Sequence, residues 1–200
     1  YPSTISPVEN PLLLLAALPI KIYITTCYHE FLEDALIRAG KQPQTDLCRW
    51  HDGLKVIPSV LDSREQFYDP TPDKPLVYHL FGLDKYPASM VIKEDDYFDF
   101  LTDLSRDNRG IHPRVSQALT ESMLILLGYE LVSWEFKVLF RGVIRPRPQT
   151  TPQANVAIQM AENDFTREYI KTYLRQARFD VEWENTNDFI QDIYEGCEGG

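Results

Sequence analysis

Two short segments hold the side chains best suited to chemistry, and each follows an apolar run. The first is Thr25-Thr26-Cys27-Tyr28-His29 and the second is Tyr78-His79-Leu80-Phe81-Gly82. Polar and glycine residues at the carboxyl ends of parallel strands line the place where open α/β sheets bind ligands. A thiol at Cys27 and an imidazole at His29 could act as nucleophile and base, but a packed thiol and a surface histidine are the commoner outcome at this spacing. The sequence therefore predicts a site at these strand ends and leaves its chemistry open.

Neither a metal site nor a disulfide framework is indicated. The acidic run Glu94-Asp95-Asp96 could resemble a metal-binding cluster, but it opens a predicted helix, where carboxylates complement the positive end of the helix dipole. Cys27, Cys48 and Cys197 are widely spaced and include no C-x-x-C pair. We therefore expect no metal ion, and a reducing, cytoplasmic setting.

Composition limits the classes of partner. The 200 residues are 44% hydrophobic, enough to bury a full core. The net charge of -10 argues against nucleic acid, which proteins bind through clustered Lys and Arg. The longest apolar run, 12–18, is too short to span a membrane. The chain starts without Met or a signal sequence, so we expect an excised piece of a larger protein.

Strand and helix patterns alternate through most of the chain. Strands are expected at 20–25, 76–80, 123–127, 155–160 and 179–183, with one or two peripheral strands within 42–73. Helices are expected at 12–18, 31–39, 93–104, 113–122, 134–144, 164–178 and 186–194. This order predicts an α/β fold with a doubly wound, mostly parallel Rossmann-type sheet in a three-layer αβα sandwich.

The two chemical segments, followed in order by three further motifs, resemble the sirtuin-like domain of bacterial proteins. The further motifs are Glu94-Asp95-Asp96-Tyr97, Leu126-Leu127-Gly128-Tyr129-Glu130-Leu131 and Ser133-Trp134-Glu135-Phe136. The resemblance continues to Val181-Glu182-Trp183 and so covers nearly the whole chain. It implies one domain over residues 1–200 with an NAD-type Rossmann fold, in a family that includes deacylases and enzymes that hydrolyse NAD.

The residues that the resemblance aligns with catalytic groups differ from the family pattern. The family uses an Asn and an Asp at the first strand end to hold the nicotinamide ribose and the attacking water, and Cys27 and His29 stand there. The family has a general-base His directly before the glycine, and here that residue is Phe81, which cannot accept a proton. His79, two residues earlier on the same strand face, is a possible substitute. The resemblance therefore implies a catalytically degenerate domain.

The cofactor-binding residues that the resemblance implies are Thr25, Thr26, Gly82, Gly128, Tyr129 and Glu130. Glu130 replaces a small polar residue with a carboxylate, which would repel a nearby phosphate. The family's Gly-Ala-Gly turn, which cradles the pyrophosphate, has no counterpart here and is expected upstream of Tyr1. We therefore expect no cofactor, or NAD or ADP-ribose if the pocket is retained.

The function predicted from these features is a regulatory, scaffolding or nucleotide-sensing module in a larger bacterial defence or signalling protein. Its partners would be other domains of the same polypeptide or other proteins, with no nucleic acid and no membrane. The alternative is an active sirtuin-like NAD hydrolase whose mechanism tolerates the changes at Cys27, His29 and Phe81.

Overall fold

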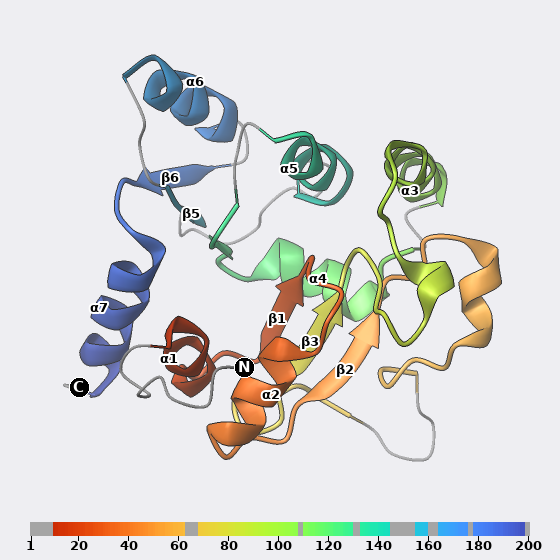
Figure 1. The fold of residues 1–200 in the computed structure, drawn as a ribbon, viewed down its shortest axis with the longest axis horizontal. Helices are drawn as coiled ribbons and strands as arrows, with labels where there is room; N and C mark the ends of the chain where they lie inside the picture. Colours follow the sequence, from red (N-terminus) through yellow and green to blue (C-terminus); the bar gives the residue numbers. More distant parts are fainter. Residues whose placement is uncertain are drawn as a thin grey trace. The chain divides into compact units, whose positions relative to one another are not determined.

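The computed structural model describes residues 10–62, 68–107, 110–129, 133–144, 155–159, 164–175 and 178–198. The chain divides into two compact units, one made of residues 1–96 and 190–200 and the other of residues 97–189. Each unit holds a three-stranded parallel sheet (Figure 1). Parallel strands that alternate with helices confirm the predicted α/β class and are consistent with a Rossmann-type fold.

In the first unit, three parallel strands end level with one another. They are β1 (Ile22–Thr25), β2 (Gln44–Leu47) and β3 (Leu76–His79), in the order β1-β3-β2. The last residue of the central strand, His79, pairs with Thr25 on one side and with Leu47 on the other. The segments that follow the three strands therefore leave the sheet at one edge, where the predicted site residues stand.

Two helices pack against this sheet and form a core with it (Figure 1). Helix α1 (Pro11–Ala17) corresponds to the helix expected at 12–18, and it begins after Asn10, whose side chain accepts a hydrogen bond from the Leu12 amide at 3.1 Å. Helix α2 (Phe31–Arg38) follows β1. The fully or nearly buried residues of this core are Ala16, Tyr23, Ala35, Leu36 and Val77. The Tyr23 hydroxyl donates to the Leu15 carbonyl at 3.1 Å, and burial raises the pKa of this tyrosine.

The loop after β3 folds back on the strand end. Gly82 has φ +91, a left-handed conformation that favours glycine, and a Cβ there would lie 2.2 Å from the Ser89 carbonyl oxygen. Ser89 ends the short 3-10 helix η3 (Pro87–Ser89) and is fully buried. Its hydroxyl accepts from the Leu83 amide at 3.0 Å and donates to the Tyr86 carbonyl at 2.7 Å. This hydroxyl therefore acts as both donor and acceptor in hydrogen bonds that hold the loop in place.

The segment after β2 holds the same loop from a second direction. Trp50 Nε1 donates to the Ser89 carbonyl at 3.0 Å, and His51 Nε2 donates to the Ala88 carbonyl at 3.2 Å. His51 Nδ1 accepts from the Gly53 amide at 3.1 Å and so caps the 3-10 helix η2 (Asp52–Val56). Two aromatic side chains thereby fix the backbone of η3.

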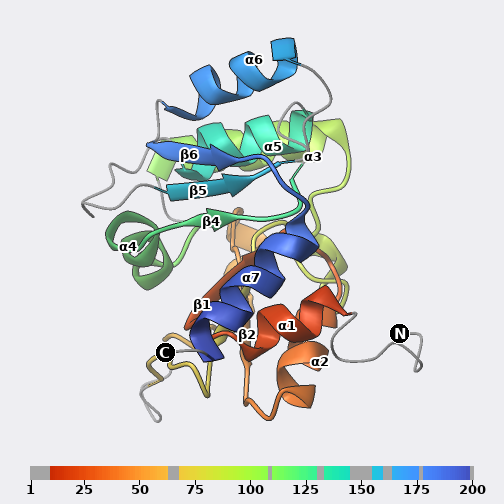
Figure 2. The ribbon, with the colours of Figure 1, turned by 90° about the vertical axis from the view of Figure 1, so that its left-hand side faces the viewer.

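The second unit contains a parallel sheet of the order β4-β5-β6 (Figure 2). Its strands are β4 (Ile125–Leu126), β5 (Asn155–Ile158) and β6 (Phe179–Glu182). Asn155 is fully buried, and its side-chain oxygen accepts from the Leu124 amide at 2.9 Å. This bond connects the first residue of β5 to the residue that precedes β4.

Helices of the second unit include two that approach each other closely. Helix α5 (Trp134–Leu139) continues into a π-helical turn, η4 (Phe140–Ile144). A Cβ at Gly142 in this turn would lie 2.7 Å from Leu101 Cδ2, so glycine permits the approach to helix α3 (Glu94–Asp107). The other α-helices in the described part of the chain are α4 (Pro113–Glu121), α6 (Asp164–Arg175) and α7 (Thr186–Glu198).

Every strand and helix predicted with a stated range has a counterpart. The strand expected at 123–127 is shorter, the helix expected at 164–178 ends at Arg175, and the last helix extends to Glu198. The peripheral strand expected within 42–73 is β2, at one end of its sheet. Among the described residues no helix has the length and apolarity that crossing a membrane requires. The single domain expected over residues 1–200 stays a prediction.

We predict that Gly82→Ala lowers the free energy of unfolding by about 2–5 kcal/mol, since the left-handed backbone and the overlap with Ser89 both oppose a Cβ. Gly40→Ala is the matched control in the same unit. Gly40 has φ +81, but a Cβ there would meet nothing within 4 Å, so only the backbone cost of about 1–2 kcal/mol applies. Urea unfolding of both variants measures the difference, and equal losses would contradict the packing argument.

Candidate functional site

The carboxyl edge of the first sheet is organised around one buried histidine. His79, the last residue of β3, is fully buried, and both ring nitrogens have partners. Nδ1 lies 2.8 Å from the Cys27 carbonyl oxygen, and Nε2 lies 2.9 Å from Glu33 Oε1. Thr45 on β2 also donates to Glu33 Oε1, at 2.8 Å. His79 thus connects the turn after β1, helix α2 and, through Glu33, strand β2.

Hydrogen-bond chemistry fixes the proton on one side of this ring. A carbonyl oxygen only accepts, so Nδ1 must carry hydrogen and donate to Cys27. The contact between Nε2 and Glu33 Oε1 then holds one proton, which belongs either to an imidazolium or to a carboxylic acid. In both arrangements the pair is neutral overall, which suits burial of two ionisable groups.

Glu33 retains one unused acceptor. Its side chain is buried, and among the described residues Oε2 has no hydrogen-bond partner. A buried polar atom without a partner is costly, because the water it loses on folding is not replaced. The bonds from His79 and Thr45 to Oε1 therefore supply the hydrogen bonds of this carboxylate among the described residues.

The turn after β1 is tied to the loop after β3 by several contacts. The Tyr28 hydroxyl donates to the Val91 carbonyl at 2.5 Å, and the Asp84 amide donates to the Tyr28 carbonyl at 2.9 Å. The exposed His29 lies 2.8 Å from the Asp84 carboxylate, and this hydrogen bond is the main reason that the pKa of Asp84 lies below its usual value. Glu30 and Lys85 form an adjacent ion pair, which raises the pKa of Lys85.

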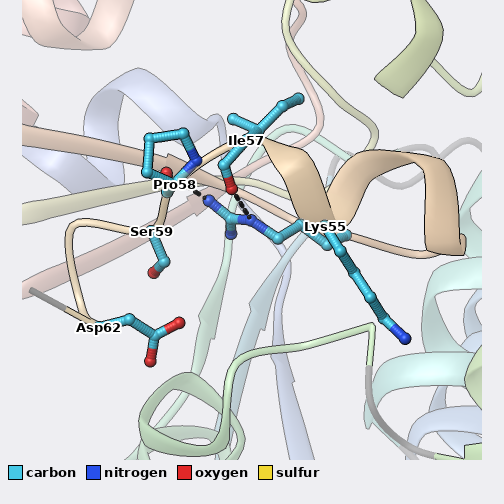
Figure 3. Close-up of a pocket in the computed structure, with 6 residues that line it drawn as sticks. Lys55, Ile57, Pro58, Ser59 and Asp62 are labelled. Carbon is cyan, nitrogen blue, oxygen red and sulfur yellow. Dashed lines mark hydrogen bonds between the residues drawn. The ribbon is translucent and has the colours of Figure 1, made fainter.

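A shallow open pocket of about 540 Å³ lies beside the segment after β2 (Figure 3). In the figure Ser59 and Asp62 lie on one side and Lys55 extends away on the other. The Arg49 guanidinium in its wall donates to the carbonyls of Leu47, Ile57 and Pro58 and to the buried Asp46 carboxylate. The Asp46 carboxylate forms an ion pair with the Arg49 guanidinium. Because this pair is neutral overall, Arg49 gives the pocket little attraction for an anionic ligand.

The remaining predicted residues of the first unit have structural surroundings. The Thr25 hydroxyl accepts from the Cys27 amide at 3.0 Å, Thr26 is half-buried and Cys27 is exposed. Phe81 is buried, and its carbonyl accepts from the Val91 amide at 2.9 Å. The structure therefore brings Thr25, Thr26, Cys27, His79, Phe81 and Gly82 to one edge of the first sheet.

Gly128 and Tyr129 follow β4 in the second unit. Gly128 is exposed with φ +71, and Gln159 Nε2, after β5, donates to the Tyr129 carbonyl at 2.8 Å. The Tyr129 ring lies 5.8 Å from that of Phe136. Glu130 lies outside the described residues. A common crevice for these residues and those of the first unit stays a prediction.

Sequence reasoning did not identify Glu33, Thr45 or Asp84 as parts of this edge. Glu33 stands within the apolar pattern of the helix at 31–39, and a carboxylate beside a core face is the one signal that could have drawn attention to it. No group of three or more potential metal ligands occurs within the described part of the chain.

Comparison with known protein families identifies one family that matches this chain. Residues 21–181 match the family model described as SIR2-like domain, which spans most of the chain and begins at the residue before β1. A search of curated proteins found no match.

We predict that Glu33→Leu and His79→Leu each lower the free energy of unfolding by about 3–5 kcal/mol, because each leaves a buried ionisable partner uncompensated. The double variant should lose several kcal/mol less than the sum of the singles, since an apolar pair replaces both groups. Thr45→Val, which removes one hydrogen bond to Glu33, should cost about 1 kcal/mol. Denaturant unfolding of the unmodified chain and the four variants tests this, and additive losses for Glu33→Leu and His79→Leu would show that the two side chains are not coupled.

Proposed function

Because this chain belongs to the SIR2-like domain family, we propose that it is a catalytically inactive member of that family. It serves as a regulatory or scaffolding module of a larger bacterial defence or signalling protein. The observation that carries this proposal is the buried Phe81 at the strand end, where the resemblance places the family's general base. A phenyl ring has no group that can take a proton from a ribose hydroxyl.

The surroundings of His79 support the same conclusion. A substitute base needs a nitrogen that reaches the substrate, and general-base catalysis contributes about 10²–10⁴-fold. His79 is fully buried, its Nδ1–H is donated to Cys27, and its Nε2 shares a proton with Glu33. Transfer of a proton from substrate to this ring would require the network to open.

The loops at this edge support a structural role as well. The turn at 25–30 and the loop at 81–91 bond to each other through Tyr28, His29 and Glu30. Polar groups that could orient a substrate are thus used in contacts within the chain. A surface fixed in this way suits recognition by another domain, because little conformational entropy is lost when it binds.

We predict that the purified chain, and the polypeptide from which it comes, releases no nicotinamide from NAD through this site. Chromatographic detection of nicotinamide over several hours measures this. His112→Ala serves as the control substitution, because His112 is the N-cap residue of α4 in the second unit. Turnover that is abolished by His79→Ala or His29→Ala but kept in the control would overturn the proposal in favour of an active hydrolase.

We also predict that the chain binds NAD and ADP-ribose more weakly than about 1 mM, or not at all. No glycine-rich phosphate cradle occurs in these residues, and a carboxylate 4 Å from a phosphate charge opposes binding by roughly 4 kcal/mol at an effective dielectric of 20. Titration calorimetry on the unmodified chain and on Glu130→Ser gives the comparison, with tighter binding expected for the variant. Micromolar binding by the unmodified chain would identify a nucleotide sensor instead.

A further inference from the structure

Two large aromatic side chains of the second unit contact each other at the surface. Phe98 on α3 and Trp134 on α5 have ring centroids 5.5 Å apart at an interplanar angle of 57°. Their exposed fractions are 49% and 42%. An exposed tryptophan beside an exposed phenylalanine is the kind of aromatic contact that dominates protein interfaces.

The core of the second unit does not require these rings. The neighbouring residues Tyr97 and Phe100 on α3, and Phe136 and Val138 on α5, are buried and supply the apolar faces of the two helices. The ring pair therefore lies outside the buried faces. Because Gly142 lets the π-helical turn after α5 approach Leu101 of α3, the two helices that carry the rings lie side by side.

The charge next to the rings is mainly negative. The first ten residues of α3 include five carboxylates and no Lys or Arg. Asp99 follows Phe98 in the sequence and Glu135 follows Trp134, and both carboxylates are exposed. The positive charges nearby are Lys93 before α3 and Arg141 in η4, both exposed, and Lys137 on α5, which is half-buried, so they offset only part of this charge. A cationic group would therefore be attracted to the surface around the rings.

Aromatic faces and carboxylates together select one kind of side chain. An arginine guanidinium is planar, stacks on Trp and Phe rings, and donates paired hydrogen bonds to a carboxylate. Lysine offers the charge without the planar stacking surface. The combination of rings and acids thus matches arginine better than any other common side chain.

We propose that the Phe98–Trp134 surface, with Asp99 and Glu135 at its rim, is a docking site for an arginine-bearing segment of a protein partner. The proposal rests on the proposed function as an interaction module and names the chemistry of its partner. The arginine side chain lies on the rings, and the carboxylates accept its hydrogen bonds.

The test uses a labelled nine-residue peptide in which arginine and leucine alternate, with matched peptides that carry Lys or Glu in place of Arg. Fluorescence anisotropy with the whole chain should give the tightest binding for the Arg peptide, weaker binding for the Lys peptide and none for the Glu peptide. Raised salt should weaken binding, because exposed charges are screened. Phe98→Ala/Trp134→Ala should raise the Kd about tenfold or more, equivalent to about 1.4 kcal/mol.

Two controls keep the result specific. Tyr169→Ala removes another exposed aromatic ring, on α6, and should leave the Kd unchanged. Asp99→Asn/Glu135→Gln changes charge without removing a ring, and should weaken binding and flatten its salt dependence even if the aromatic variant fails to fold. Absence of binding by the Arg peptide, or equal Kd values in wild type and both site variants, would overturn the proposal. Nicotinamide release is measured in a separate assay, so the test of catalytic inactivity and the test of peptide binding can fail independently.

Discussion

The buried contact between His79 and Glu33 links the strand, turn and helix that meet at the carboxyl edge of the first sheet. Two ionisable groups are tolerated in the interior because they compensate each other and because Cys27 and Thr45 supply further hydrogen bonds. The geometry of four segments is thereby coupled. The end of β3, the turn after β1, the first turn of α2 and the middle of β2 cannot shift independently without exposing or stranding a polar atom.

This coupling bears on how the polar residues at this strand edge are used. His79, Asp84, Ser89 and Trp50 all bond to groups of the same chain. A catalytic site needs donors and acceptors directed at the substrate and already in place when it arrives. In this chain the described hydrogen bonds at the edge of the first sheet connect its strands, helix α2 and loops to one another.

The order and type of the elements could be predicted because their signals are local. Asn10-Pro11 marks the start of α1, Gly40 follows the end of α2, and alternation over 179–183 marks β6. The partners of His79 could not be predicted in this way. Glu33 and Thr45 reach it only through the pairing of β2 and β3 and the packing of α2, which no local pattern contains. The same holds for Ser89, whose contact with Gly82 depends on how the loop between them closes.

The hydrogen bonds at this edge also have large separations along the sequence. His79 meets Cys27 across 52 residues and Glu33 across 46, and Tyr28 meets Val91 across 63. The entropy of closing such loops must be overcome before any of these contacts can stabilise the chain. During synthesis, therefore, Cys27, Tyr28 and Glu33 leave the ribosome well before their partners, and none of these bonds can form until β3 and the loop after it have been made.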